Sequence, residues 1–209
     1  VGRVDGVPFA WKPGQNVTWL PLPNGIINPT GVNSHGDVVG IDDSQVWRYI
    51  TTSGSFEILA TNPTGIIDVN DFGQVSGGLP GKKNTFYPKV FSASGWQQVG
   101  STPGWSQEIN NRGQICGRLW AKGWGPDTVF VYDPEDGYWN MDELIDGTVD
   151  DLLMWFSGDF QNDMNPNGMS QVESGYPVIV GVKWTGGDLW DDGIARKMGF
   201  VLTPIAAAP

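Results

Sequence analysis

The sequence has few of the residues on which thiol, metal and nucleic-acid chemistry depend. It contains one Cys and one His in 209 residues. A lone Cys116 cannot form an intrachain disulfide, and no second Cys or cluster of His accompanies it to make a thiol-based zinc site. Basic residues are also scarce, because 12 Lys and Arg stand against 23 Asp and Glu, for a formal net charge of −11. Such a chain repels a phosphate backbone, so we expect no nucleic-acid partner.

Long apolar runs are missing as well. No stretch of about 18 consecutive apolar residues occurs, so the sequence predicts no transmembrane segment. The chain begins with Val1 rather than Met, which fits a mature, processed or partial product. His35 is accompanied by no G-x-S-x-G sequence, and a Ser-His-Asp hydrolase is therefore not expected.

Glycine and proline, in contrast, are abundant. The chain has 30 Gly and 15 Pro, spread at short intervals as many turns between short strands would require. Hydrophobic residues make up 39% and aromatic residues 12%, which is enough to build a core. These features together predict a folded all-β protein.

A short pattern recurs along the chain: an Asn, two variable residues, a Gly and a small apolar run. It reads VNSHGDVVG at 32–40, VNDFGQVSG at 69–77, INNRGQICG at 109–117 and, more loosely, MNPNGMSQV from 164. Successive Asn residues are separated by 37, 40 and 55 positions. A period of about 40 is the size of one four-stranded blade of a β-propeller. The turn residues so identified are Asn33 and Gly36, Asn70 and Gly73, Asn110 and Gly113, and Asn165 and Gly168.

The pattern has a physical interpretation as the hairpin between the first and second strands of each repeat. The Asn side chain can bond to the backbone two residues on, and the Gly supplies the positive φ that such a loop needs. A second Gly, at positions 40, 77 and 117, falls inside the second strand. Without a side chain it would permit a β-bulge or the close approach of a neighbouring sheet.

Both ends of the chain match incomplete repeats. Residues 1–20 fit the end of a second strand followed by a third and a fourth, whereas 177–204 fits a second and a third strand. With three full repeats between them, the sequence predicts one propeller domain of about five blades over 1–204 and a tail or linker at 205–209. Because unpaired strand edges are a hazard, we expect neighbouring chain, either the rest of a longer polypeptide or another subunit, to complete one terminal blade by strand addition.

At these residues the sequence resembles the HAF-type extracellular repeat proteins of bacteria. The matching pieces are 32–40, 69–77, 109–117, PFAWKPG at 8–14 and GFVLTP at 199–204. The last copy departs from the pattern, since about six additional residues separate its turn from the Gly that follows. The resemblance implies secretion and a β-propeller-like architecture, and it brings no enzymatic activity and no catalytic residues.

Three acidic residues stand two positions before a turn Asn: Asp68, Glu108 and Asp163. In equivalent registers of the innermost strands they could converge on a central channel, where they would bind a cation or act as a glycosidase site. The other interpretation, which we favour, is that they accept hydrogen bonds from backbone donors or face channel water, since catalysis requires a geometry that spacing alone does not show.

Two further clusters could bind ligands. Trp124 and Trp190 lie in Gly-rich polar insertions, where an indole could stack on a sugar or anchor a protein, or else fold back onto a blade edge. Asp188, Asp191 and Asp192 could ligate calcium, although their spacing is not that of an EF-hand and a solvated turn explains them as well. No cofactor is expected.

The sequence therefore favours a secreted, non-enzymatic β-propeller at the cell surface or outside the cell. Its role would be structural or interactive, in a matrix, sheath or filament, with itself or another extracellular protein as partner. The alternatives are a carbohydrate-active propeller that uses Asp68, Glu108 and Asp163, and a lectin-like polysaccharide binder that works through loop Trp residues.

Overall fold

The computed structural model confirms the all-β class. It describes residues 1–11, 14, 16–22, 28–42, 44–81, 85–120, 128–140, 164–171, 177–185 and 196–203. Within these ranges the chain forms 18 β-strands and no helix. No described segment is therefore a helix of the length and apolarity that crossing a membrane requires.

The strands form five antiparallel sheets, three with four strands and two with three. The first sheet consists of β1 (Gly2–Val4), β2 (Val7–Ala10) and β3 (Thr18–Trp19). The second consists of β4 (Pro29–Val32), β5 (Val38–Ile41), β6 (Gln45–Ile50) and β7 (Ser55–Thr61). The third consists of β8 (Thr64–Val69), β9 (Val75–Pro80), β10 (Phe86–Ser92) and β11 (Gly95–Gln98). The fourth consists of β12 (Gly104–Ile109), β13 (Ile115–Leu119), β14 (Thr128–Asp133) and β15 (Gly137–Asn140), and the fifth of β16 (Met164–Met169), β17 (Ile179–Thr185) and β18 (Arg196–Leu202).

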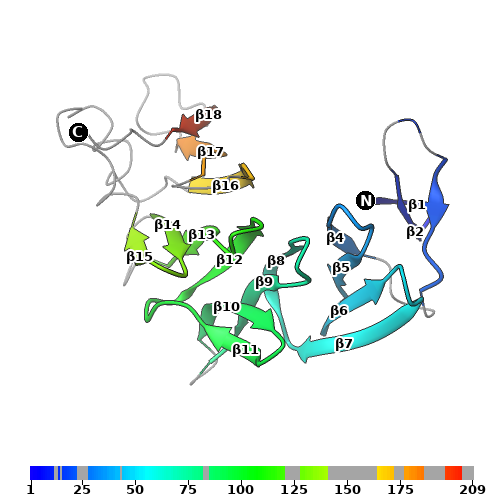
Figure 1. Cartoon of the computed structure of the whole chain (residues 1–209). Helices are drawn as coiled ribbons and strands as arrows, with labels where there is room; N and C mark the ends of the chain where they lie inside the picture. Colours follow the sequence, from blue (N-terminus) through cyan, green and yellow to red (C-terminus); the bar gives the residue numbers. More distant parts are fainter. Residues whose placement is uncertain are drawn as a thin grey trace.

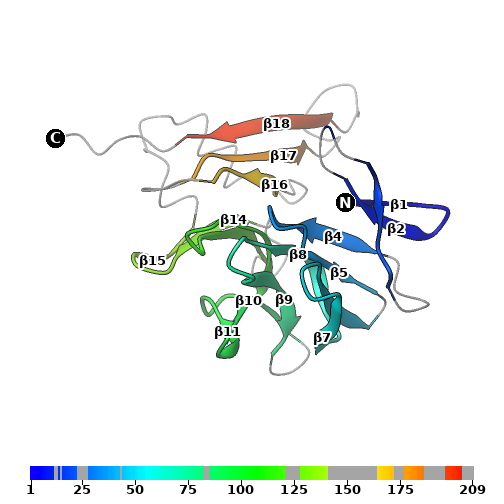
Figure 2. The ribbon, with the colours of Figure 1, turned by 45° about the vertical axis from the view of Figure 1, so that its right-hand side comes forward.

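From the second sheet to the fifth, consecutive sheets meet through their first strands. Strand β4 contacts β8, β8 contacts β12, and β12 contacts β16. Figure 1 shows the five sheets in sequence order along an arc, with β1–β3 at one end and β16–β18 at the other. Turned by 45°, Figure 2 shows β16, β17 and β18 side by side in that order.

The first sheet holds the second, third and fourth strands of a repeat, as the sequence predicted. Each second strand contacts the first strand of the following sheet, in the pairs β5 and β8, β9 and β12, and β13 and β16; the pair β1 and β4 continues this series. The last strands of the first and third sheets also end in the same way. The Leu20 N–H donates to Pro8 O at 3.1 Å, just as the Val99 N–H donates to Pro88 O at 2.9 Å. Strand β1 therefore occupies the second position of its repeat.

The core lies between consecutive sheets rather than at one central point. Val39 and Val46 of the second sheet pack with Ile67 and Val75 of the third. The residue that follows the fourth strand joins the next cluster in the same way: Leu20 packs with Val38 and Trp47, and Val99 packs with Ile109 and Phe130. Burial of these apolar side chains, at about 25 cal/mol per Å², holds each sheet to its neighbour.

The glycines in the second strands lie opposite β-bulges. Pairing shifts between Pro29 and Gly31 in β4, between Thr64 and Asp68 in β8, and between Ser106 and Glu108 in β12. The bulge that the sequence predicted is thus present. The close approach differs from the prediction: an added Cβ on Gly117 would lie 2.2 Å from Trp105 O in the first strand of its own sheet, not in a neighbouring sheet.

The fourth turn requires a correction. Asn165 and Gly168 lie inside strand β16, paired with β17, and not in a turn after a first strand. Ser170 takes the turn position instead, since its N–H donates to Val178 O as the Asn110 N–H donates to Gln114 O. Pro166, which follows Asn165, has no N–H. In the other three turns, the residue after the Asn donates its N–H to a side chain of the next turn.

Candidate functional site

Each of the three other Asn-x-x-Gly sequences folds into the same turn. The Asn Oδ1 accepts the N–H of the residue four positions on, at 2.9 Å from Asp37, 3.0 Å from Gln74 and 3.1 Å from Gln114. The turn Gly donates its N–H to the Asn carbonyl and has a φ of 90° at Gly36 and 72° at Gly73. Gly adopts such a positive φ without the steric cost that a side chain brings, which explains its place in the pattern.

The same Asn side chains also link one turn to the next. Asn33 Nδ2 donates to Asn70 O at 3.2 Å, Asn70 Nδ2 donates to Asn110 O at 2.9 Å, and Asn110 Nδ2 donates to Ser170 O at 3.4 Å. We call this series, formed by Asn33, Asn70, Asn110 and Ser170, the turn ladder. All three Asn side chains are buried. The turn Asn therefore stabilises the contact between sheets as well as its own hairpin.

A second series of bonds runs beside the turn ladder through the next residue of each turn. The Ser34 N–H donates to Asp71 Oδ1 at 2.6 Å, and the Asp71 N–H donates to Asn111 Oδ1 at 2.9 Å. The Asn111 N–H donates to Gln171 Oε1 at 2.6 Å, which confirms that Ser170 and Gln171 replace Asn and its successor in the last turn. Pro166 could neither donate nor accept with its side chain in this series.

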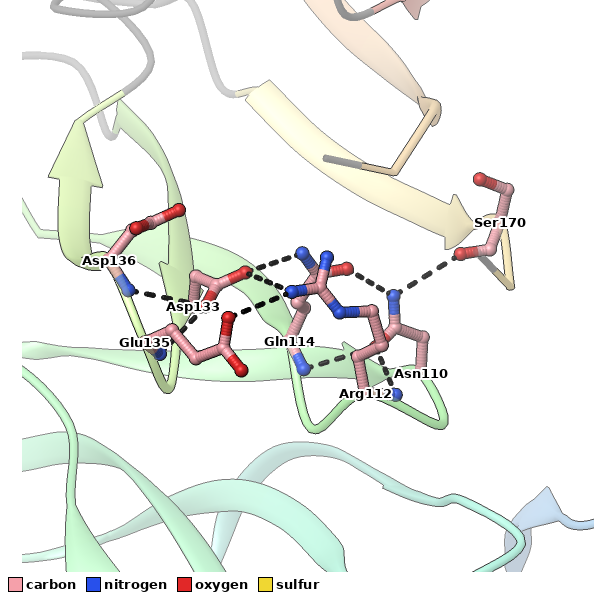
Figure 3. Close-up of polar contacts among 7 residues, drawn as sticks. All are labelled: Asn110, Arg112, Gln114, Asp133, Glu135, Asp136 and Ser170. Carbon is pink, nitrogen blue, oxygen red and sulfur yellow. Dashed lines mark hydrogen bonds and ion pairs between the residues drawn. The ribbon is translucent and has the colours of Figure 1, made fainter. Parts of the chain in front are cut away.

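Sequence reasoning missed the fifth residue of the turn. Asp37, Gln74 or Gln114 follows each turn Gly, and its side chain accepts from the Asn Nδ2 at 3.2, 2.7 and 2.6 Å respectively. In Figure 3, Gln114 also reaches the hairpin between β14 and β15, where its Nε2 donates to Asp133 Oδ2 at 2.6 Å. The sequence did contain a signal for this residue, since Asp or Gln directly follows the Gly in all three turns.

Asp133 is held as a carboxylate at the far end of this connection. Burial favours the protonated acid, but hydrogen bonds from Gln114 and from the N–H groups of Glu135 and Asp136 outweigh it and lower the pKa of Asp133 below its ordinary value. Arg112 lies 3.8 Å from Asp133 and 3.4 Å from Glu135. These contacts fix the two hairpins of the fourth sheet to one another (Figure 3).

Two of the three predicted carboxyl groups converge. Asp68 on β8 and Glu108 on β12 share a hydrogen bond, and Asp68 Oδ2 accepts the Ile109 N–H at 3.1 Å. Gly31 of the second sheet occupies the position equivalent to these two acids. A Cβ added to Gly31 would lie 2.7 Å from Asp68 Oδ1, so a third acid does not fit there while Asp68 keeps its present side-chain conformation. Asp68 thus accepts a hydrogen bond from a backbone N–H, which is the interpretation of these acids that the sequence favoured.

The two carboxyl groups hold one proton between them at neutral pH. Burial raises the pKa of Asp68 to about 6, although bonds from Ile109 and Glu108 oppose the rise. Burial, the charge of Asp68 and the bond to Asp68 raise the pKa of Glu108 to about 8. Glu108 is therefore the donor and Asp68 the carboxylate. Cys116, which pairs with Glu108 across the sheet, has its thiol pKa raised by burial and by these two acids.

This pair differs from the carboxyl pair of a glycosidase. Glycosidases keep their two carboxyl groups about 5 Å or more apart, to leave room for the sugar or a water. A direct hydrogen bond is much shorter than that separation. The arrangement instead resembles two acids that share one proton because both cannot ionise side by side.

The carboxyl pair makes stability depend on pH. Both pKa values are raised by folding, so the contribution is complete at low pH and is lost as pH rises through about 6 and about 8. We expect the unfolding free energy to fall by on the order of 2 kcal/mol between about pH 5 and pH 9, after allowance for solvent screening. Urea unfolding across this range measures it.

Glu108→Gln keeps the shape of the protonated acid and should flatten that decline, whereas Glu135→Gln, at a side chain that is 80% exposed, should leave it unchanged. An equal decline in wild type and Glu108→Gln would show that the pair does not share a proton.

The remaining predicted site residues lie outside the described residues. They are Asp163, Trp124, Trp190, Asp188, Asp191 and Asp192. Within the ranges that the structure describes, no three His, Cys, Asp or Glu side chains gather in a way that could hold a metal ion. Calcium binding and sugar stacking at those six residues stay predictions.

Comparison with known proteins gives no family for this chain. No protein-family model matches the sequence, and a search of curated proteins returns no match.

Proposed function

We propose that the protein is a non-enzymatic β-propeller, secreted to the cell surface or the extracellular space, that serves as a structural and interaction module. The five sheets would be its blades, and the turn ladder would link each blade to the next. Support comes from the series of equivalent sheets that pack through their first strands, and from the resemblance of their turns to HAF-type repeats. The hydrogen bond that Asp68 accepts from the Ile109 N–H of the neighbouring sheet supports a structural role for this acid.

The observation that carries the interaction role is the distribution of exposed apolar side chains. The end sheets and their adjoining turns contain most of the large apolar residues that the described part of the chain exposes, whereas the three middle sheets expose only a few. Those at the ends are Val1, Val4, Val7, Trp11, Val17, Trp19, Val180 and Val201, and those in the middle are Val32, Ile58 and Phe72.

Trp19 shows the contrast most clearly. It stands in β3, the fourth strand of its repeat, and it is 54% exposed. Trp96 on β11 packs in the core between the second and third sheets and donates its Nε1–H to Leu59 O at 2.9 Å. Concentrated apolar exposure marks protein interaction sites, so the end sheets are the surfaces on which the chain would associate.

Sedimentation velocity over a range of concentrations tests this proposal. We expect wild-type chains to form oligomers, because apolar burial between end sheets favours association. The double variant Val4→Lys with Trp19→Lys should shift the distribution to monomer, since it places charge on the first sheet. The matched double variant Ile58→Lys with Phe72→Lys changes two residues of the middle sheets that are 43% and 75% exposed, and it should associate like wild type.

A wild-type chain that stays monomeric at about 100 μM, a concentration at which interfaces with micromolar Kd are occupied, would contradict self-association. An equal loss of oligomers in both double variants would also contradict it, because the end sheets would then have no special role.

A further inference from the structure

The surface between the third and fourth sheets is polar where the preceding one is apolar. The second sheet has Val39 six positions after its turn Asn, and the third sheet has Ile67 three positions before its own. These two residues are fully buried and pack together. One repeat further on, the equivalent positions hold Ser76 and Gln107, which are 0% and 2% exposed. Buried polar groups therefore replace an apolar contact between the third and fourth sheets.

Two buried serines face this surface from opposite sides. Ser76 on β9 pairs with Val90, which packs against the core cluster of the fourth sheet. Ser106 on β12 pairs with Gly117, and Ile115, on the same face of β13 as Gly117, belongs to that cluster. Both serines are 0% exposed, and neither hydroxyl has a hydrogen-bond partner among the described residues. Buried hydroxyls nearly always bond to protein, water or an ion, so this surface suits a polar ligand.

Two acids add charge to the serine hydroxyls. Asp68 pairs with Ser76 across β8 and β9, which places their Cβ atoms about 4.5–5.5 Å apart on one face of the sheet. Asp68 also bonds to the Ile109 N–H of the fourth sheet and to Glu108. We call Asp68, Ser76, Ser106 and Glu108 the polar seam. Their side chains offer only oxygen atoms, which are the ligands that hard cations prefer.

We propose that the polar seam binds one calcium ion, which joins the third sheet to the fourth. Asp68 and Glu108 supply the negative charge, and the hydroxyls of Ser76 and Ser106 supply further oxygen ligands from the two sides. Calcium accepts about six to eight oxygen ligands in flexible geometry, so backbone carbonyls and water complete its coordination. The inference goes beyond the proposed function, because the ion acts within one chain and requires no association.

Calcium takes the place of the proton that the two acids share. Burial and the charge of Asp68 raise the pKa of Glu108 to about 8, so Glu108 holds that proton at pH 7. Binding of the ion releases the proton to solvent, and the affinity should therefore rise by nearly tenfold per pH unit between about pH 6 and pH 8. Cys116, which pairs with Glu108, is a neutral thiol in this range because burial raises its pKa.

Thermal unfolding of the whole chain after treatment with EDTA tests the proposal. Titration calorimetry with CaCl2 gives the Kd, and CaCl2 at a hundredfold excess over that Kd should raise the Tm of wild type by about 5 °C or more, because the ion binds only the folded chain. MgCl2 at the same concentration controls for screening of this acidic chain. It should raise the Tm less, since Mg²⁺ gives up its water reluctantly and demands octahedral geometry.

Three variants locate the site. Ser76→Val introduces the residue that the second sheet has at the equivalent position, so it should keep the fold, and it should weaken calcium binding by at least about tenfold through loss of a ligand. Asp68→Asn removes a charged ligand and should abolish the Tm shift. Glu135→Gln changes an acid that lies outside the polar seam and is 80% exposed, and it should respond like wild type. Circular dichroism shows which variants keep the fold, and Ser76→Val decides the matter where Asp68→Asn does not.

The acids at positions 188, 191 and 192 are a second predicted source of calcium binding, and they lie outside the described residues. The triple variant Asp188→Asn, Asp191→Asn and Asp192→Asn should keep the Tm shift and one calcium per chain. Loss of the shift in this variant would overturn the inference.

Three other results would also overturn it: no shift in wild type, an equal shift with MgCl2, or unchanged calcium affinity in a folded Ser76→Val chain. Sedimentation separates this inference from the proposed function. A chain that associates without binding calcium loses only the polar seam as a site, whereas a monomer that binds calcium keeps the site and loses self-association.

Discussion

Replacing Gly117 with Ala should reduce the unfolding free energy by about 3 kcal/mol or more, which is the range of severe overpacking in a core. The added Cβ would lie 2.2 Å from Trp105 O, 2.7 Å from Ser106 Cα and 2.7 Å from the Phe130 ring. Two of these are backbone atoms, held by the bulge between Ser106 and Glu108. They cannot retreat without breaking the pairing of β12 with β13. Urea unfolding at one pH measures the loss.

Gly77→Ala is the matched control for this substitution. Gly77 occupies the equivalent position of the third sheet, but its added Cβ would meet only one close atom, Ile67 Cδ1 at 2.2 Å, and the next lies at 3.6 Å. The tip of a side chain can rotate away, so the loss should be less than about 1.5 kcal/mol. Equal losses at the two positions would contradict the claim that backbone approach makes Gly117 indispensable.

Replacing Asn110 with Ala should cost about 2–4 kcal/mol of unfolding free energy, as expected when a buried polar network loses its centre. Asn110 is fully buried. It accepts from the Arg112 and Gln114 N–H groups at 3.0 and 3.1 Å, and it donates to Gln114 Oε1 and Ser170 O. Ala would remove all four of these hydrogen bonds. Thermal and urea unfolding both measure the effect.

Asn33→Ala tests the same turn at the end of the turn ladder. Asn33 is 6% exposed and, among the described residues, makes one bond fewer, since its Oδ1 accepts from Asp37 alone. Its loss should therefore be smaller than that of Asn110→Ala by about 1 kcal/mol, the worth of one hydrogen bond. A loss at Asn33 equal to or larger than that at Asn110 would contradict a cost set by the number of hydrogen bonds that each Asn makes.

Much of the fold could be predicted because its signals are local. The Asn and Gly of each turn act on residues within four positions, and alternation of β-branched and aromatic residues marks the strands between them. The same local signals predicted which three strands of a repeat the first sheet contains. The fourth turn could not be placed this way. MNPNG contains the pattern, but the proline at 166 removes the N–H that the neighbouring turn requires, and Ser170 lacks the Asn on which the search relied.

The site could be predicted only in part for a related reason. Equal register places Asp68 and Glu108 on adjacent first strands, and their convergence was one of the two interpretations that the sequence left open. Their sharing of a proton depends on burial and on the bulges in both strands, which no spacing reveals. The turn ladder depends on which turns are neighbours in space. Only the structure shows that Asn70 donates to Asn110 O, 40 residues away.

The central claim is that turns about 40 residues apart in the sequence are neighbours in the fold, a repeat length typical of propeller blades. A double-mutant cycle between Asp71 and Asn111 tests it most directly, because Asn111 Nδ2 donates to Asp71 Oδ2 at 2.8 Å across two sheets. Unfolding free energies of Asp71→Ala, Asn111→Ala and the double variant should give a coupling energy of about 1 kcal/mol. Additive losses, with coupling below about 0.3 kcal/mol, would show that these side chains do not meet and that the sheets are not joined through their turns.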